Sequence, residues 1–110
     1  MSNNPPFNFG LGTITWNSWA LDESKTPEEQ LWHYGEGFLQ VNYEKSNLTL
    51  HVEWRQDGEN EPGKFVVQLI KNCDWEHPVM EEYCRTIPEL YAIIEKFIAK
   101  ANDLESAANK

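Results

Sequence analysis

Histidine and cysteine side chains are the first candidates for chemistry in this chain, which has three histidines and two cysteines among 110 residues. Cys73, His77 and Cys84 are close in sequence, with three residues between the first two and six between the last two. Zinc sites usually pair their ligands at shorter and more regular spacings, so this pattern predicts no metal site. We interpret both cysteines as free thiols that pack as small apolar residues.

His51 is the best candidate for acid–base catalysis. Its segment alternates between apolar and polar residues, which places it on the outward face of a strand with Glu53 two residues later. Gln40 and Gln68 could flank the imidazole from neighbouring strands. A single histidine on a solvated strand face is more often an ordinary surface residue. The sequence also has no glycine-rich phosphate loop, nucleophile elbow or metalloprotease helix, so we predict no catalytic residue, metal or cofactor.

Charge limits the classes of partner. Eighteen acidic residues against nine basic ones give a net charge of -9. That field repels phosphate backbones, so we expect no direct nucleic-acid partner, and it would steer a basic protein toward the chain. No apolar run approaches the roughly 20 residues of a membrane span, and the first residues do not resemble a signal peptide. We therefore expect no membrane contact and a cytoplasmic location.

The strands that would position these residues are read from apolar and polar alternation with a period of two. Strands are predicted over residues 7–17, 38–44, 48–55, 64–71 and 79–84. The first includes a bulge at Gly12 and Thr13, where the alternation slips by one residue. The last contains two adjacent glutamates, which would place it at an edge of the sheet.

Two capping boxes predict the helices. Thr86 and Glu89 begin an apolar stripe of helical spacing, which predicts a helix from about Ile87 to Ala101. The segment Thr26-Pro27-Glu28-Glu29 predicts a short helix near residues 27–33. The length suits one domain.

The predicted fold is α+β: an antiparallel β-meander of four to five strands, one face of which is covered by the C-terminal amphipathic helix, with a short helix before the second strand. Residues 7–103 form the domain, residues 1–6 a disordered tail and residues 104–110 a fraying tail. The uncovered face should show Phe38, Val66 and Ile70 among polar neighbours, which would suit self-association or a bound partner chain.

A meander brings the segment before its second strand to the same end of the sheet as the connection between its third and fourth strands. Acidic residues gather in both segments, and only Lys25, Arg55 and Lys64 are close enough in sequence to offset them. We predict that this acidic end binds a basic partner; the alternative is a solvated face that keeps the protein soluble. The predicted partner-binding residues are Asp22, Glu23, Glu28, Glu29, Trp32, Glu36, Asp57, Glu59 and Glu61.

Five tryptophans are more than a core of this size easily buries. Trp16 and Trp54 are in phase with inward strand positions and are predicted to be core residues. Trp19, Trp32 and Trp75 fall in loops or in the short helix. They could form part of an interface, because indole offers a large rigid contact area, or they could cover the open ends of the sheet.

These observations favour a small acidic non-enzymatic protein-binding module, of the inhibitor, immunity-type or regulatory kind, that binds a basic protein partner. The alternative is a small-molecule-binding or enzymatic domain with a site between the helix and the sheet, lined by tryptophan and by His51 or His33. A homodimer through the uncovered face is the third hypothesis.

Overall fold

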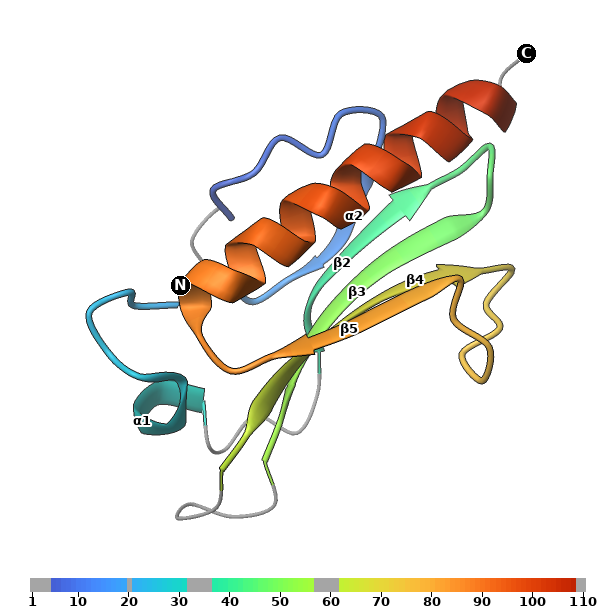
Figure 1. The fold of residues 1–110 in the computed structure, drawn as a ribbon. Helices are drawn as coiled ribbons and strands as arrows, with labels where there is room; N and C mark the ends of the chain where they lie inside the picture. Colours follow the sequence, from blue (N-terminus) through green and yellow to red (C-terminus); the bar gives the residue numbers. More distant parts are fainter. Residues whose placement is uncertain (1–4, 20, 32–36, 57–61, 109–110) are drawn as a thin grey trace.

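Five antiparallel strands form one sheet in which each strand pairs with its neighbour in sequence (Figure 1). The computed structural model describes residues 5–19, 21–31, 37–56 and 62–108, without the side chains of Glu28 and Leu31. The elements are β1 (Thr13–Asn17), α1 (Pro27–Leu31), β2 (Gly37–Tyr43), β3 (Leu48–Arg55), β4 (Lys64–Lys71), β5 (Met80–Cys84) and α2 (Ile87–Ala108). The α+β class, the antiparallel meander and the covering helix are confirmed.

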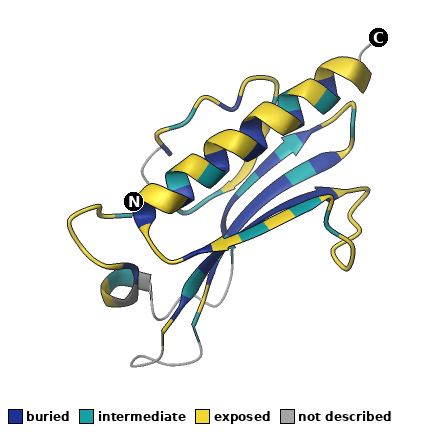
Figure 2. Cartoon of the chain, in the orientation of Figure 1, coloured by how far each residue is buried: buried dark blue, intermediate teal, exposed yellow. Residues whose placement is uncertain are grey.

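The two central strands carry most of the core. On β3, Leu50, Val52 and Trp54 are fully buried on the face toward α2, and their register partners on β4 add to the same core. Alternation of apolar residues therefore builds the covered face, as the sequence predicts. Figure 2 shows this buried band running along the strands beneath the helix.

Helix α2 covers the sheet with one apolar stripe. It begins after Thr86, whose hydroxyl oxygen accepts a hydrogen bond from the Glu89 backbone N–H at 3.3 Å. Leu90, Ile94 and Phe97 are fully buried against the strands. Burial of each such side chain stabilises the fold by roughly 1.5–3 kcal/mol. Truncating Phe97 would therefore leave a cavity beneath the helix and loosen it from the sheet.

Helix α2 is longer than predicted and continues to Ala108 instead of ending near Ala101. Asn102 looks like a stop signal in the sequence, but its side chain anchors the N-terminal segment. Its amide nitrogen donates to the Phe9 carbonyl at 3.1 Å, and its oxygen accepts from the Leu11 N–H at 2.8 Å. Residues 104–108 of the predicted fraying tail are therefore helical, whereas residues 109–110 lie outside the described part of the chain.

Glu105 fixes the last turns of α2 to the turn between β2 and β3. Its carboxylate accepts hydrogen bonds from the Lys45 N–H at 3.1 Å, the Ser46 N–H at 2.8 Å and the Ser46 hydroxyl at 2.7 Å. The residue is only 5% exposed. Burial raises the pKa of Glu105, but the bonds from Ser46 and Lys45 together outweigh it and hold the pKa below its ordinary value.

The N-terminal part of the predicted first strand is not a strand. Residues 7–12 form a turn-rich segment in which Gly10 has a φ of 62°, and β1 begins only at Thr13. The Tyr43 hydroxyl donates to the Phe9 carbonyl at 2.9 Å and holds this segment at the core. Of the predicted disordered tail, residues 1–4 lie outside the described residues, and Pro5 is buried.

The prediction of a buried Trp16 is wrong, because the bulge in β1 lies between Ile14 and Trp16 and not at Gly12. Trp16 pairs with Gln40, which faces away from α2, and its side chain is 53% exposed. The extra residue turns the tryptophan to the uncovered face of the sheet. Trp54 is fully buried, as predicted.

A second bulge, between Gly37 and Leu39, corrects the prediction for Phe38. Phe38 lies in the core and not on the uncovered face, with its ring centre 5.4 Å from that of Trp19 and 6.1 Å from that of Phe65. Trp19 itself is 2% exposed. It therefore covers the core, which agrees with the hypothesis that the loop tryptophans cover the open ends of the sheet.

We expect Glu105→Gln to lower the free energy of unfolding at neutral pH by about 2 kcal/mol, because it removes a buried, multiply bonded carboxylate. Urea denaturation at pH 7 measures the change, and the exposed Glu95→Gln variant on the same helix serves as the control, within about 0.5 kcal/mol of wild type. The pKa of Glu105 is lowered, so its contribution is present above the ordinary glutamate pKa and is lost as the pH falls below it. Equal free energies of unfolding for the two variants would show that the bonds of Glu105 to the turn between β2 and β3 do not stabilise the fold.

Candidate functional site

The face of the sheet that α2 leaves uncovered holds a hydrogen-bonded network around His51. The Gln40 amide nitrogen lies 3.1 Å from Nδ1 and the Glu53 carboxylate lies 3.2 Å from Nε2. An amide nitrogen only donates, so Nδ1 accepts and Nε2 carries the proton toward Glu53. The Trp75 ring packs nearly perpendicular to the imidazole, with ring centres 5.1 Å apart. His51 is 8% exposed, so the interpretation of His51 as an ordinary surface residue is wrong.

Glu53 extends this network to Arg55, whose Nε and Nη2 donate to the carboxylate at 2.9 and 3.2 Å. The hydrogen bond from His51 and then the bonds and charge of Arg55 lower the pKa of Glu53 to about 2. Both ring nitrogens of His51 are thus engaged, and its carboxylate partner stays ionised at neutral pH. Proton exchange with an outside molecule would first require one of these bonds to break.

A second network runs beside the first on β4 and β5. The Gln68 amide and the Tyr83 hydroxyl each donate to the Glu81 carboxylate. The Lys64 ammonium lies 4.3 Å from the centre of the Tyr83 ring, an arrangement in which a cation is attracted to an aromatic face. The bond from Tyr83 and the bond from Gln68 lower the pKa of Glu81. The polar residues of this face are therefore held in one arrangement by each other.

Three large aromatic side chains stand exposed on this uncovered face. Trp16 is 53%, Tyr83 50% and Trp75 44% exposed. Trp16 is opposite Gln40 and Tyr83 is opposite Val66, both on the side away from the core, and Trp75 reaches the same side to contact His51. Val66 and Ile70 lie outside the core that packs on α2, as predicted, but both are fully buried instead of exposed. Aromatic residues therefore dominate the apolar surface that remains accessible on this face.

The meander places the start of β2 and the end of β3 at the same end of the sheet, as the sequence predicts, because Gly37 pairs with Glu53. Helix α1 also lies at this end (Figure 1). Of the predicted partner-binding residues, Asp22, Glu23 and Glu29 are described and exposed, and each accepts a hydrogen bond from the chain itself. The others, Trp32, Glu36, Asp57, Glu59, Glu61 and the Glu28 side chain, lie outside the described residues.

Asp22 and Glu29 bond locally around α1, whereas Glu23 bonds to a distant residue on α2. Asp22 accepts from the Ser24 N–H at 2.9 Å, and Glu23 accepts from the Tyr91 hydroxyl at 2.8 Å. Glu29 accepts from the Thr26 N–H at 3.1 Å, which completes a capping box at the start of α1. The bonds from Ser24 lower the pKa of Asp22, and those from Thr26 lower the pKa of Glu29.

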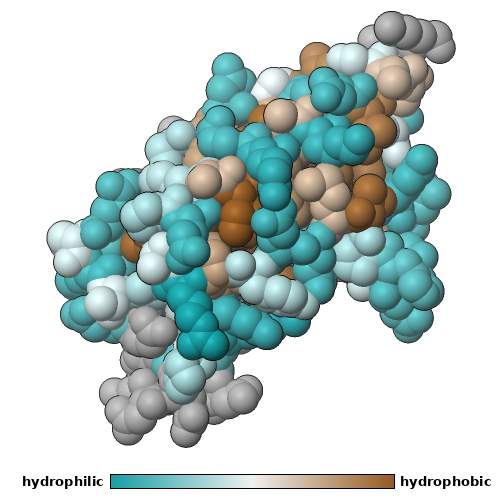
Figure 3. All heavy atoms as spheres, in the orientation of Figure 1, coloured by the Kyte–Doolittle hydropathy of each residue, from teal (hydrophilic) through white to brown (hydrophobic). Residues whose placement is uncertain are grey.

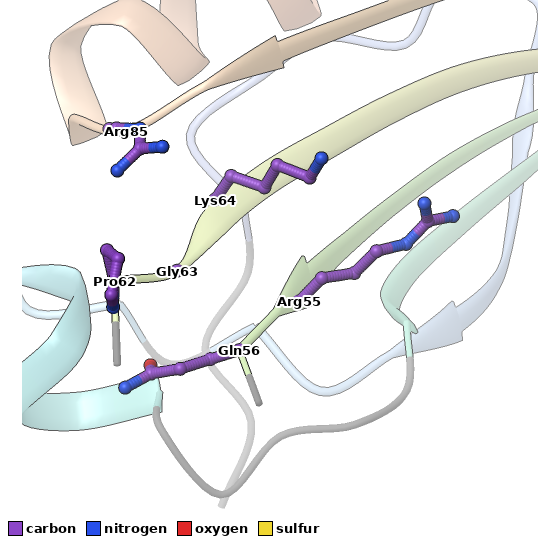
Figure 4. A pocket seen from close by; sticks show the side chains of 6 residues that line it. All are labelled: Arg55, Gln56, Pro62, Gly63, Lys64 and Arg85. Carbon is purple, nitrogen blue, oxygen red and sulfur yellow. The ribbon is translucent and has the colours of Figure 1, made fainter. Parts of the chain in front are cut away.

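Three basic residues form a row at this end, and sequence reasoning missed one of them. Arg55 pairs with Lys64 across β3 and β4, and the pairing of Phe65 with Cys84 brings Arg85 beside Lys64. They border a shallow pocket of about 360 Å³ (Figure 4). In Figure 4 the Arg85 side chain points toward Pro62, and the other two extend along their strands. Arg85 therefore joins the cations that offset the acidic end, a placement that only the predicted fifth strand could have indicated.

The cysteines differ from each other. Cys84 is buried in the core, and burial raises the pKa of its thiol to about 12, so it packs as predicted. Cys73 is exposed in the loop after β4, with a φ of 58°, so its prediction as a packed residue is wrong. Within the described ranges, no three His, Cys, Asp or Glu side chains are grouped so that they could hold a metal ion.

The structure removes His51 from the alternative site between helix and sheet. His51 faces away from α2, so it cannot line that site, and His33 lies outside the described residues. A hollow of about 610 Å³ does lie beside the C-terminal end of α2, and neither tryptophan nor histidine is among its lining residues. They include Lys45, Leu48, Lys71, Val79, Leu104 and Ala107.

Comparison with known proteins finds no matching family, no matching curated protein and no matching solved structure. Among the described helices, none combines the length and the apolar character that crossing a bilayer would require.

We expect Glu53→Gln to destabilise the protein by about 1 to 3 kcal/mol at pH 5, because His51 and Arg55 lose a charged acceptor. The lowered pKa of Glu53 means that its contribution is present above its ordinary pKa and is lost as the pH falls toward about 2. The difference from wild type should therefore shrink between pH 5 and pH 3 in urea denaturation. A start at pH 5 avoids most of the titration of histidine itself.

Glu76→Gln, in the exposed loop before β5, is the control for that series and should stay within about 0.5 kcal/mol of wild type at both pH values. A difference for Glu53→Gln that is the same at pH 5 and pH 3 would show that the carboxylate has no lowered pKa.

Proposed function

We propose that this chain is a non-enzymatic protein-binding module that binds a basic protein partner on the uncovered face of its sheet. The proposal depends on one observation: the three exposed aromatic side chains Trp16, Trp75 and Tyr83 share that face. Aromatic residues are enriched at interfaces because each offers a large rigid area at a small cost in side-chain entropy.

The chemistry of this face suits a partner with lysine or arginine side chains. Indole and phenol rings attract cations, as the Lys64 ammonium over the Tyr83 ring illustrates within the chain. The Glu81 carboxylate is exposed beside Tyr83 and could accept hydrogen bonds from a basic side chain. The networks around His51 and Gln68 hold the surface in one arrangement, which lowers the entropy lost on binding.

The net charge of -9 supports the same class of partner. Long-range attraction speeds the encounter with a basic protein even where the contact surface is nearly neutral. We propose that the acidic end contributes this steering, while Arg55, Lys64 and Arg85 reduce the negative potential next to it. A cytoplasmic setting belongs to the proposal and is supported by two cysteines that are free thiols.

The uncovered face is tested with Trp16→Ala and Tyr83→Ala. The wild-type chain is immobilised, proteins from the cells that produce it are captured and identified, and the captured protein is purified for affinity measurement. We expect a basic partner whose dissociation constant rises about tenfold or more with each variant, the effect of removing a binding hot spot.

The matched control is Leu11→Ala. Leu11 is as exposed as the tested residues, at 56%, but its backbone N–H donates to Asn102 on α2, so it does not lie on the uncovered face. This control should bind within about twofold of wild type. The proposal fails if no protein binds saturably, if the partner is acidic, or if all three variants bind equally.

The acidic end is tested by the triple variant Asp57→Asn, Glu59→Gln, Glu61→Gln. Rim charges act mainly on the association rate, so we expect this rate to fall on the order of fivefold at low salt and to approach the wild-type rate at high salt. The triple variant Glu44→Gln, Glu95→Gln, Asp103→Asn changes the net charge equally at other sites. Equal slowing by both triple variants would assign the steering to net charge and remove the acidic end as a site.

A further inference from the structure

The hollow beside the C-terminal end of α2 has the volume of a small-molecule site. Its volume of about 610 Å³ lies within the roughly 300–1,000 Å³ typical of ligand pockets. It is bounded by the turn between β2 and β3, by the end of β4 and the residue before β5, and by the last turns of α2. Figure 3 shows apolar atoms beside the C-terminal half of α2 on the face in view.

Apolar side chains form the floor of this hollow. Leu48 is buried beneath it, Leu104 and Ala107 line the side of α2, and Val79 lines the opposite side. Val79 is 45% exposed, although its backbone N–H is fixed by a bond of 2.8 Å to the Leu69 carbonyl. A large apolar side chain held in place at the mouth of a hollow is available to a ligand.

The walls are held by hydrogen bonds between segments that are far apart in sequence. The Asn72 N–H donates to the Asn47 carbonyl at 2.9 Å, and the Asn47 side-chain amide donates to the Asn72 side-chain oxygen at 2.9 Å. Glu105 clamps α2 to the same turn. The hollow is therefore preformed, and a ligand would not have to order it on binding.

The charge of the lining is opposite to the charge of the whole chain. Lys45 and Lys71 line the hollow, and no acidic residue is among its described lining residues. The neighbouring Glu105 carboxylate is buried and accepts three hydrogen bonds from Lys45 and Ser46. Lys45 and Lys71 are thus the charged side chains that line the hollow, and the charges of the chain beyond about 10 Å are largely screened at ordinary salt.

We propose that this hollow binds a small amphiphile: an apolar chain that carries an anionic head group. The apolar chain lies against Val79, Leu48 and Leu104, and the head group lies on the side of Lys71. That side is preferred because the C-terminal end of α2 carries the negative end of the helix dipole, which would repel an anion.

This site is separate from the proposed protein-binding face. Leu48 pairs with Lys71 at one end of β3 and β4, so the hollow is separate from the acidic end, where Arg55 pairs with Lys64. The hollow also lies on the side of α2, and the exposed aromatic residues lie on the opposite face. The amphiphile site can therefore be tested without the protein partner.

Dodecanoate, below its micelle concentration, is the probe, and its binding to the full chain is measured by isothermal titration calorimetry. Dodecanol and dodecyltrimethylammonium are the neutral and cationic comparisons. We expect saturable binding of one dodecanoate per chain, weaker binding of dodecanol, and the weakest binding of the cation.

Variants locate the site. Val79→Asp should weaken dodecanoate binding about tenfold, and Lys71→Glu should weaken dodecanoate about fivefold but leave dodecanol within about twofold. The controls are Ile14→Asp, at a residue 41% exposed on β1, and Lys25→Glu, at an exposed residue just before α1 at the other end of the molecule. Both control variants should bind dodecanoate with the affinity of the wild-type chain.

Ala107→Trp provides an independent test, because Ala107 is exposed in the last turn of α2 and a larger side chain there fills the hollow without entering the core. Circular dichroism should stay unchanged while dodecanoate binding is lost. The proposal is overturned by the absence of saturable binding, by equally tight binding of the cationic amphiphile, or by unchanged binding in Val79→Asp and Ala107→Trp.

Discussion

A single helix has to cover a sheet of five strands, and this mismatch of width shapes the rest of the molecule. Strands lie about 4.8 Å apart, so five of them span about 19 Å, whereas a helix with its side chains is about 10–12 Å wide. Helix α2 therefore packs over the central strands, where its Leu90, Ile94 and Phe97 meet the apolar side chains of β3 and β4. The edges of the covered face need other covers. The N-terminal segment provides one, held by Asn102 and Tyr43, and the hollow beside Leu104 is a part that remains open.

Neither of the described helices lies over the other face of the sheet, and the side chains of that face shield one another instead. Val66 and Ile70 are fully buried there, and His51 and Gln68 are nearly so. A buried imidazole or amide without a partner would cost a few kcal/mol, which explains why Gln40, Glu53 and Glu81 are placed to bond them. Such a bonded layer is rigid but offers little apolar area of its own. The area available to a partner is then the aromatic side chains that stand above it.

Regular parts of the fold could be predicted from the sequence, because their signals are periodic and local. The alternation over β3 and β4 and the capped apolar stripe of α2 each repeat over many residues, so single irregular positions do not obscure them. Bulges are different. One extra residue reverses the facing of all that follows, and this error sent Trp16 to the core and Phe38 to the surface. The sequence shows only that a phase slips somewhere, while the paired strand decides at which residue the ladder breaks.

Contacts between distant segments account for the other errors. Asn102 and Glu105 resemble the polar end of a helix, and only their bonds to Leu11 and Ser46 show why the helix continues past them. Arg85 joins Lys64 in the same way, through the pairing of β4 with β5 and not through proximity in sequence. Both corrections change the electrostatics of the candidate sites. Glu105 is held next to the hollow by its bonds to Lys45 and Ser46, whereas Lys45 and Lys71 are the charged residues that line it. Arg85 makes one end of an acidic protein mixed in charge. Net charge therefore describes how a partner approaches this chain, while the sign at each contact is set by the charged side chains that lie next to it.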